Sequence, residues 1–292
     1  MSEGIAGFID AAWNDHAANP RGVAARLASA RPLLEAEPAQ VGEFLWLAEH
    51  VLVGHLGDAD AMQPWLDVMA PLVALHPNAA PAFERARLAT RLLNGALPVV
   101  GEQPPAVQVR ALGSAANGFI ARGYSVRARH LLEHAAAIGR APGAGADALK
   151  ALAAAYNNLA SHLLDAPRDA ERDALMTQAA KDSRDTWREA GTWLNVERAE
   201  YLLALCGAAI GDGENAVGHA RECLAICEAN DADAFERFFA REALGRSLIA
   251  AGDHAAARAE FAAMQALLGS IDEDSRAYPQ SALDKLERGL AV

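Results

Sequence analysis

A pattern of small and apolar residues recurs along the chain and constrains the fold more than any other feature. Its clearest copy runs from Arg241 to Met264, where the small residues Gly245 and Ala257 allow two helices to approach and Gly252 stands at the turn. Weaker copies occur at Leu112, Ala115, Ala116, Phe119, Gly123, Ala128, Leu132 and Ala135, at Glu200, Leu203, Ala204, Gly207, Gly211, Ala216, Ala220 and Cys223, and at Trp46, Val53, Gly57, Met62, Leu66 and Met69. A single helix pair cannot bury its apolar face, so the sequence predicts an all-α fold, an α-solenoid of stacked antiparallel helix pairs.

This frame resembles the tetratricopeptide repeat, which has Trp-x2-Leu-Gly-x2-Tyr before the turn glycine and Ala, Phe and Ala after it. The turn glycines Gly123, Gly211 and Gly252 are 88 and 41 residues apart, and Tyr156-Asn157-Asn158-Leu159-Ala160 marks another copy in the longer gap. A period of about 41–45 residues, with Tyr-Asn-Asn-Leu-Ala, looks like the kinesin-light-chain type of repeat. The resemblance covers 105–270 well and 40–95 in part.

Proline, glycine and aspartate divide the chain into helical segments. Asn19-Pro20 and Glu37-Pro38 end helices, because the residue before proline avoids the α conformation. Gly57-Asp58, Gly211-Asp212 and Gly252-Asp253 suit a C-terminal glycine followed by a capping residue. Helices are expected over 3–16, 20–36, 40–56, 59–75, 80–95, 105–121, 125–139, 146–165, 170–190, 193–210, 214–229, 233–251, 254–268 and 277–290.

Four parts are expected along the chain. Residues 1–97 form an N-terminal helical segment with one or two degenerate repeats, and 98–105 form a proline-rich linker. Residues 106–270 form the tetratricopeptide-like array, and 271–292 form a capping helix. The pairing around the linker stays open: the helix over 80–95 either stands alone or pairs with 105–121.

Composition excludes several classes of partner. The net charge is −12 and no run of Lys and Arg occurs, so neither nucleic acid nor an anionic membrane is an expected partner. No apolar stretch approaches the length of a bilayer span. The first residues lack the pattern of a signal peptide, and three cysteines do not make a disulfide framework, so a cytoplasmic location is expected.

The resemblance implies that the first helix of each pair lines a concave groove. Carried onto this chain, the groove positions and their neighbour in Tyr-Asn-Asn-Leu-Ala are Arg110, Asn117, Asn157, Asn158, Ser161, Arg198, Tyr201, Glu242 and Arg246. An Asn amide can hold an extended peptide by its backbone, and an Arg can bind a carboxylate through two hydrogen bonds. Three arginines favour an acidic peptide or a free C-terminus. The alternative is that these groups only face solvent.

Other patterns are weighed and mostly assigned to structure. His219, Cys223 and Cys227 share a helix face, with Cys206 on the preceding helix, but Cys223 occupies a small-residue position of the repeat. A solvated helix face is the preferred interpretation for His130 with His134. His50 and His55 lie with Asp58 and Asp60 at a helix end and turn, where N-capping and the helix dipole explain the two aspartates. Trp187 and Trp193 are expected as core anchors, with an exposed binding pair as the alternative. No metal site or cofactor is predicted.

These observations predict a non-catalytic adaptor that binds a protein or peptide segment, and the motifs of common enzymes are not found. The first alternative is a sensor whose groove binds a small molecule or signalling peptide and so regulates a partner protein. The others are a helical enzyme or metal protein built on the His and Cys clusters, and a purely structural role. The oligomeric state is left open.

Overall fold

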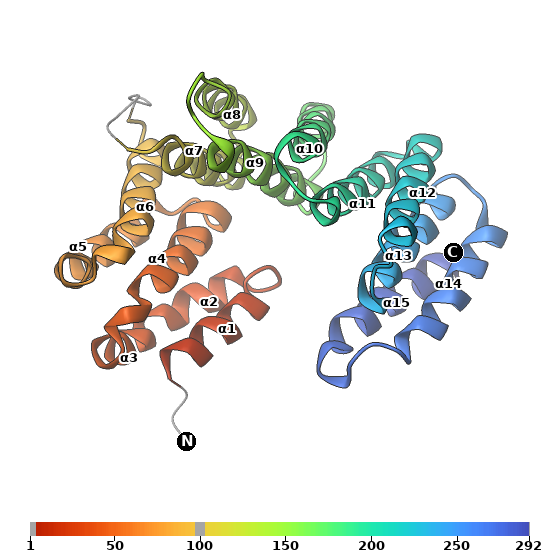
Figure 1. The fold of residues 1–292 in the computed structure, drawn as a ribbon, viewed down its shortest axis with the longest axis horizontal. Coiled ribbons are helices and arrows are strands. Elements are labelled where there is room, and N and C mark those ends of the chain that lie inside the picture. The colour runs from red at the N-terminus through yellow and green to blue at the C-terminus, as the bar shows by residue number, and fades with distance from the viewer. Residues whose placement is uncertain (1–3, 97–102, 292) are drawn as a thin grey trace. The chain divides into compact units, whose positions relative to one another are not determined.

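The computed structural model describes residues 4–96 and 103–291, and helices make up most of both ranges, without a strand (Figure 1). The predicted all-α fold class is therefore confirmed. No helix within these ranges is both long and apolar enough to cross a membrane. The α-helices are α1 (Ile5–Asp15), α2 (Pro20–Arg26), α3 (Arg31–Ala36), α4 (Val41–Glu49), α5 (Ala59–Leu75), α6 (Ala80–Leu93), α7 (Pro105–Ala121), α8 (Ser125–Gly139), α9 (Ala146–Leu164), α10 (Ala170–Ala190), α11 (Trp193–Ile210), α12 (Gly213–Ala229), α13 (Ala234–Ala250), α14 (His254–Leu268) and α15 (Ala277–Leu290).

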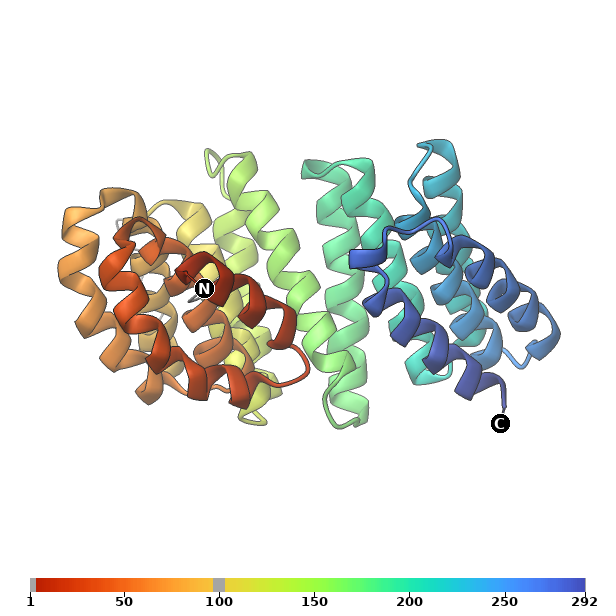
Figure 2. The same ribbon diagram turned by 90° about the horizontal axis from the view of Figure 1, so that it is seen from below.

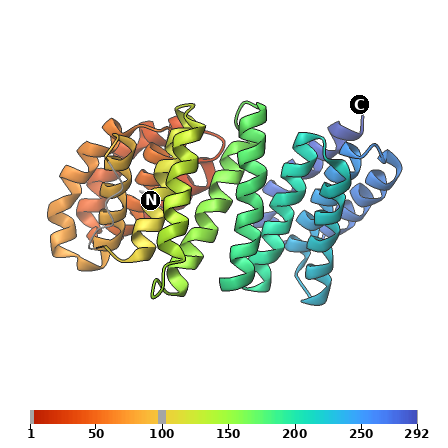
Figure 3. The same ribbon diagram turned by 90° about the horizontal axis from the view of Figure 1, so that it is seen from above.

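Contacts divide the chain into an N-terminal unit, Met1–His162, and a C-terminal unit, Leu163–Val292. In the C-terminal unit each helix from α10 to α15 packs against the next one along the chain (Figure 3). In addition, α11 contacts α13 and α13 contacts α15. These helices thus form one layer, and α12 and α14 pack on it, which is the arrangement of a solenoid.

The N-terminal unit follows a similar order. Helix α1 packs against α2 and α4, and α6 packs against α4, α5 and α7 (Figure 2). The second alternative for the pairing around the linker is therefore the one found, since α6 does not stand alone. Residues 97–102, most of the predicted linker 98–105, lie outside the described residues. The division into units falls after His162, because helices on both sides of the linker pack together.

Most helix ends lie within three residues of the predicted ones. Capping side chains fix several of the N-terminal ends. The side chains of Asn19, Asp58 and Asp253 accept backbone N–H groups of Gly22, Ala61 and Ala256 at 3.0, 2.9 and 3.0 Å. One expected helix, 20–36, is interrupted by a 3₁₀ turn at Leu27–Ala30. The interruption precedes Pro32, which lacks the N–H needed to continue an α-helix and clashes with the carbonyl four residues earlier.

The expected helix over 40–56 changes its winding in its second half. His50–His55 forms a π-helix that continues α4, and the N–H of Leu56 donates to the carbonyl oxygen of Val51, five residues earlier, at 3.0 Å. Nothing in the repeat pattern indicated this segment. Because π-helices are rare and occur frequently at functional sites, the segment marks this part of the N-terminal unit for closer inspection.

The clearest repeat, over 241–264, packs largely as predicted. Leu244, Leu248 and Met264 are buried between α13 and its neighbours. At Gly245, however, helix α15 approaches more closely than α14. A Cβ at Gly245 would lie 2.9 Å from the side chain of Leu286 in α15. A similar approach occurs at Gly213, the first residue of α12, where a Cβ would lie 2.6 Å from the backbone of Ala251.

Two glycines of α12 give a matched test of this packing. Gly213→Ala is expected to lower the free energy of unfolding by about 1–3 kcal/mol, because backbone atoms cannot move away as a side chain can. Gly218→Ala on the same helix meets nothing within 4 Å and is expected to raise stability by up to about 1 kcal/mol through helix propensity. Urea unfolding followed by circular dichroism measures both, and equal effects of the two substitutions would contradict the close approach.

Candidate functional site

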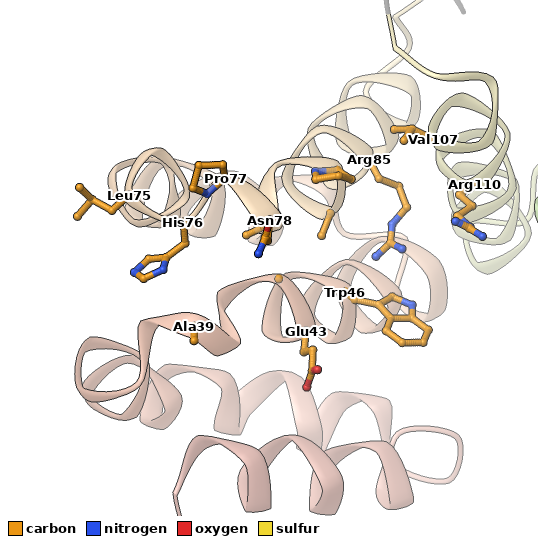
Figure 4. Close-up of a pocket in the computed structure, with 14 residues that line it drawn as sticks. Ala39, Glu43, Trp46, Leu75, His76, Pro77, Asn78, Arg85, Val107 and Arg110 are labelled. Atoms are coloured by element: carbon orange, nitrogen blue, oxygen red, sulfur yellow. The ribbon is translucent and has the colours of Figure 1, made fainter. Parts of the chain in front are cut away.

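Two adjacent cavities lie on one face of the N-terminal unit. The outer cavity, of about 550 Å³, lies between α4 and the segment 75–85, with Trp46, Leu75 and Arg85 in its wall (Figure 4). The inner cavity, of about 460 Å³, is lined by α4, the π-helix, α6, α7 and α9, and contains Glu49, Asn117 and Asn158. Trp46, Arg85 and Arg110 line both, so we call the two together the groove.

Large apolar and cationic side chains meet in the outer cavity. Trp46 is 51% exposed and Leu75 is 74% exposed, although both are apolar. The guanidinium of Arg85 lies 5.9 Å from the ring centroid of Trp46 and points toward it, with Arg110 close by (Figure 4). Arg110 is exposed and makes no ion pair with a described residue. Tryptophan and arginine are the residue types that dominate binding energy at protein interfaces.

A buried ion pair forms one wall of the inner cavity. Arg85 Nε lies 2.7 Å from Glu49 Oε2, and the side chains are only 13% and 2% exposed. Glu49 Oε1, Arg85 Nη2 and Asn117 Oδ1 are buried without a hydrogen-bond partner in the described part of the chain, and the contact of Arg85 Nε with Glu49 is an ion pair without the alignment of a hydrogen bond. Buried polar atoms normally have partners, so a ligand that supplies both donors and acceptors would complete this group once the side chains move to expose these atoms.

Helix geometry explains how these residues meet. Arg110, Ser114 and Asn117 are spaced four and three residues apart and lie on one face of α7. On α9, Ala151, Ala154 and Asn158 are three and four residues apart and likewise lie on one face. The two helices approach closely at Gly113, where a Cβ would lie 2.6 Å from the Cβ of Ala155.

The structure brings together three of the predicted groove residues, Arg110, Asn117 and Asn158. Asn157 and Ser161 do not line either cavity. Successive residues of an α-helix point about 100° apart, and here Asn158, not Asn157, is turned toward the inner cavity. Sequence reasoning missed Glu49 and Arg85 as site residues and assigned Trp46 to the repeat frame. A charged residue on an apolar helix face, Glu49, was the available signal.

The predicted groove residues of the C-terminal unit are engaged with one another. The Tyr201 hydroxyl donates to Glu242 Oε2 at 2.6 Å, and Arg246 Nη1 donates to Glu242 Oε1 at 3.0 Å. Burial, followed by the charge of Glu242, raises the pKa of Tyr201 well above its usual value. Arg198 pairs with Glu236. The Glu242 carboxylate and the guanidinium groups of Arg198 and Arg246 therefore all have partners within the unit.

His219 and the cysteines, which share a helix face in the sequence, are divided between two networks in the structure. His219 Nδ1 lies 2.7 Å from Glu200 Oε2, while Arg184 and Arg188 donate to Glu200 Oε1. The Cys223 thiol instead donates to Glu197 Oε1 at 2.9 Å. Hydrogen bonding with Cys227, followed by burial, raises the pKa of Cys223.

Cys206, Trp187 and Trp193 differ from one another in how deeply they are buried. Burial raises the pKa of the Cys206 thiol to about 12, which keeps it protonated near neutral pH. Trp193 is 39% exposed, so the expected role as a core anchor is wrong for this residue. Its partner Trp187 is half-buried.

The comparisons with known proteins assign the chain to no family. No protein-family model matches the chain, and no curated protein matches it significantly. The candidate site therefore rests on the arrangement of the side chains.

The Glu49–Arg85 pair gives a test of the inner cavity. Arg85→Met is expected to destabilise the protein by about 3–5 kcal/mol, because it leaves the buried Glu49 carboxylate without its partner. Adding Glu49→Gln to Arg85→Met is expected to restore most of the loss. Urea unfolding of the three proteins measures this, and a double substitution no more stable than Arg85→Met alone would contradict the pairing.

Glu197 makes stability depend on pH. Burial is the main cause that raises the pKa of its carboxyl above the usual value, so the folded state binds a proton that the unfolded state releases above about pH 4.3. The free energy of unfolding is therefore expected to fall as pH rises through the window above that value. Glu197→Gln should remove this slope, and the exposed Glu222→Gln should retain it in urea unfolding measured between pH 4.5 and 7.5. Identical slopes in wild type and Glu197→Gln would refute the assignment.

Proposed function

We propose that this protein is a non-catalytic cytoplasmic adaptor that binds a carboxylate-bearing peptide segment of a partner protein in the groove of its N-terminal unit. The observation that carries the proposal is the meeting of Arg110, Asn117 and Asn158 with Arg85 and Trp46 around one cavity. The resemblance of the repeats to tetratricopeptide repeats supports it, because such arrays bind peptides on the face formed by their first helices.

The unpartnered atoms define the chemistry of the ligand. Arg85 Nη2 is a donor that a carboxylate satisfies, while Asn117 Oδ1 and Glu49 Oε1 are acceptors that peptide N–H groups satisfy. A peptide end supplies both kinds of group within a few ångströms. Hydrogen bonds to charged groups contribute about 1.5–3 kcal/mol each, so a few such contacts suffice for selective binding.

The outer cavity extends this site for further residues of the peptide. Trp46 and Leu75 offer exposed apolar surface on either side of it, and Arg110 lies where the two cavities join. An apolar side chain next to the carboxylate would cover Trp46. We therefore propose a segment with an apolar residue near an acidic residue or near its free C-terminus.

A small-molecule sensor is the second candidate, and the size of the inner cavity favours it. Ligand pockets of about 300–1,000 Å³ are typical for small molecules, and the inner cavity of about 460 Å³ falls in this range. A small carboxylate would use Arg85, Asn117 and Arg110 in the same way. It would leave the apolar surface at Leu75 uncovered.

A random hexapeptide library with free C-termini, and the same library amidated, tests the first proposal. Peptides selected by the wild type are expected to lose at least about tenfold in affinity when Arg110 is replaced by Ala, since one charged hydrogen bond corresponds to about that factor. Fluorescence anisotropy measures the affinities. Arg91→Ala, which removes an exposed arginine of α6 outside both cavities, is the matched control and should bind as wild type.

The outcomes separate the candidates. Peptides that bind Arg110→Ala as tightly as wild type would move the binding site out of the groove. If no peptide binds wild type, a panel of small carboxylates measured by thermal shift tests the sensor, and stabilisation of wild type but not of Arg110→Ala would favour it.

A further inference from the structure

Three histidines converge beside the inner cavity. His16 follows α1, and His50 and His55 are the first and last residues of the π-helix. One ring nitrogen from each lies within 4.8 Å of the other two, and the Nε2 atoms of His50 and His55 are 3.1 Å apart. In the described ranges, no other group of three His, Cys, Asp or Glu side chains is close enough to share an ion.

The π-helix is what creates this cluster. In an α-helix, residues five apart point in directions that differ by about 140°, because each residue turns the chain by about 100°. In a π-helix, with bonds between residues five apart, they lie on the same face. The ring centroids of His50 and His55 are accordingly 4.8 Å apart. The unusual winding thus serves to align two imidazoles.

The third imidazole is oriented by the backbone. His16 Nδ1 hydrogen-bonds to the carbonyl oxygen of Trp13, so Nε2 is the nitrogen available as a ligand. Such an outer hydrogen bond from a histidine fixes the tautomer and orients the ring in metal sites. The rings of His16 and His50 also pack against Trp13, with centroid distances of 5.0 and 5.1 Å, which restricts their movement.

The distances suit a transition-metal ion. Zinc bonds to histidine nitrogen at about 2.0–2.1 Å, which separates two tetrahedral ligands by about 3.4 Å. The Nε2 atoms of His50 and His55, 3.1 Å apart, are close to this separation, and one ring nitrogen of His16 lies within 4.8 Å of a nitrogen of each.

We propose that His16, His50 and His55 form a binding site for a divalent transition-metal ion, zinc in the first place, with three nitrogen ligands and one open position. The ring of His162, 5.6 Å from that of His55, is the nearest further imidazole. The site departs from the expectation drawn from sequence, which placed His50 and His55 at a helix end and turn and assigned Asp58 and Asp60 there to helix capping. It does not depend on the proposed peptide binding.

Untagged full-length protein, freed of metal with a chelator and dialysed, is the material for the test. Titration calorimetry with zinc chloride is expected to show one ion bound per chain. His50→Gln and His55→Gln are each expected to weaken binding by at least about tenfold, the loss seen even for outer groups of metal sites. His254→Gln in the C-terminal unit is the matched control and should bind as wild type. Binding that survives both substitutions, or no zinc bound by wild type, overturns the proposal.

A second measurement on the wild type alone guards against variants that fail to fold. X-ray absorption of the zinc-loaded protein is expected to show nitrogen ligands at about 2.0 Å and no sulfur near 2.3 Å. Sulfur ligands, or loss of zinc in Cys223→Ser, would place the ion at the cysteines and overturn the assignment. Quenching of tryptophan emission by copper(II), through Trp13 beside the cluster, is expected in wild type and reduced in His50→Gln.

Discussion

The N-terminal unit depends on one close backbone approach, that of Gly118 in α7 to the carbonyl oxygen of Val53 in the π-helix. A Cβ at Gly118 would lie 2.4 Å from that oxygen, so no other residue allows this packing without movement of the backbone. The approach fixes α7 against the π-helix, and Arg122 at the end of α7 then donates to the carbonyl oxygens of Gly57 and Leu93 at 2.6 and 2.9 Å. Asn117, the neighbour of Gly118, is placed in the inner cavity by the same contact.

Much of the fold was predictable because its signals are local. Helix ends at Asn19, Asp58 and Asp253 follow from capping chemistry, which acts over three residues and is legible in any single sequence. The π-helix was not predictable, because no local residue preference indicates it and the helix that packs against it, α7, is distant in the sequence. The division after His162 was not predicted for a related reason. A proline-rich segment indicates only where a helix cannot continue, whereas the boundary between two units depends on contacts between distant helices.

For the candidate site, the sequence indicated that α7 and α9 carry polar residues of the types that bind a peptide. Which of Asn157 and Asn158 lines the cavity depends on how α9 is rotated about its axis, and the sequence does not give this rotation.

Buried carboxylates distinguish the two units. In the C-terminal unit, both oxygens of Glu200 and both oxygens of Glu242 are held by Arg, His or Tyr side chains. In the N-terminal unit, Glu49 has a partner for one oxygen only, and the arginine that holds it keeps a further unpartnered nitrogen. An unsatisfied buried polar group costs about 1–3 kcal/mol, so the half-satisfied Glu49 beside a cavity marks a place where a ligand would complete the pairing. This contrast is the physical reason to place ligand binding at the groove of the N-terminal unit. Glu197 in the C-terminal unit also has one unpartnered oxygen, Oε2, but its Oε1 accepts the Cys223 thiol, and burial raises the pKa of this carboxyl.

His50 belongs to both proposed sites, and this links them energetically. Its ring lines the inner cavity and also faces His16 and His55. An ion on the three histidines would fix the ring of His50 and place positive charge near the Glu49–Arg85 pair. That charge favours a carboxylate in the cavity, and by reciprocity a bound carboxylate favours the ion. The π-helix, whose winding aligns His50 with His55, would then serve as the physical connection between metal binding and the groove.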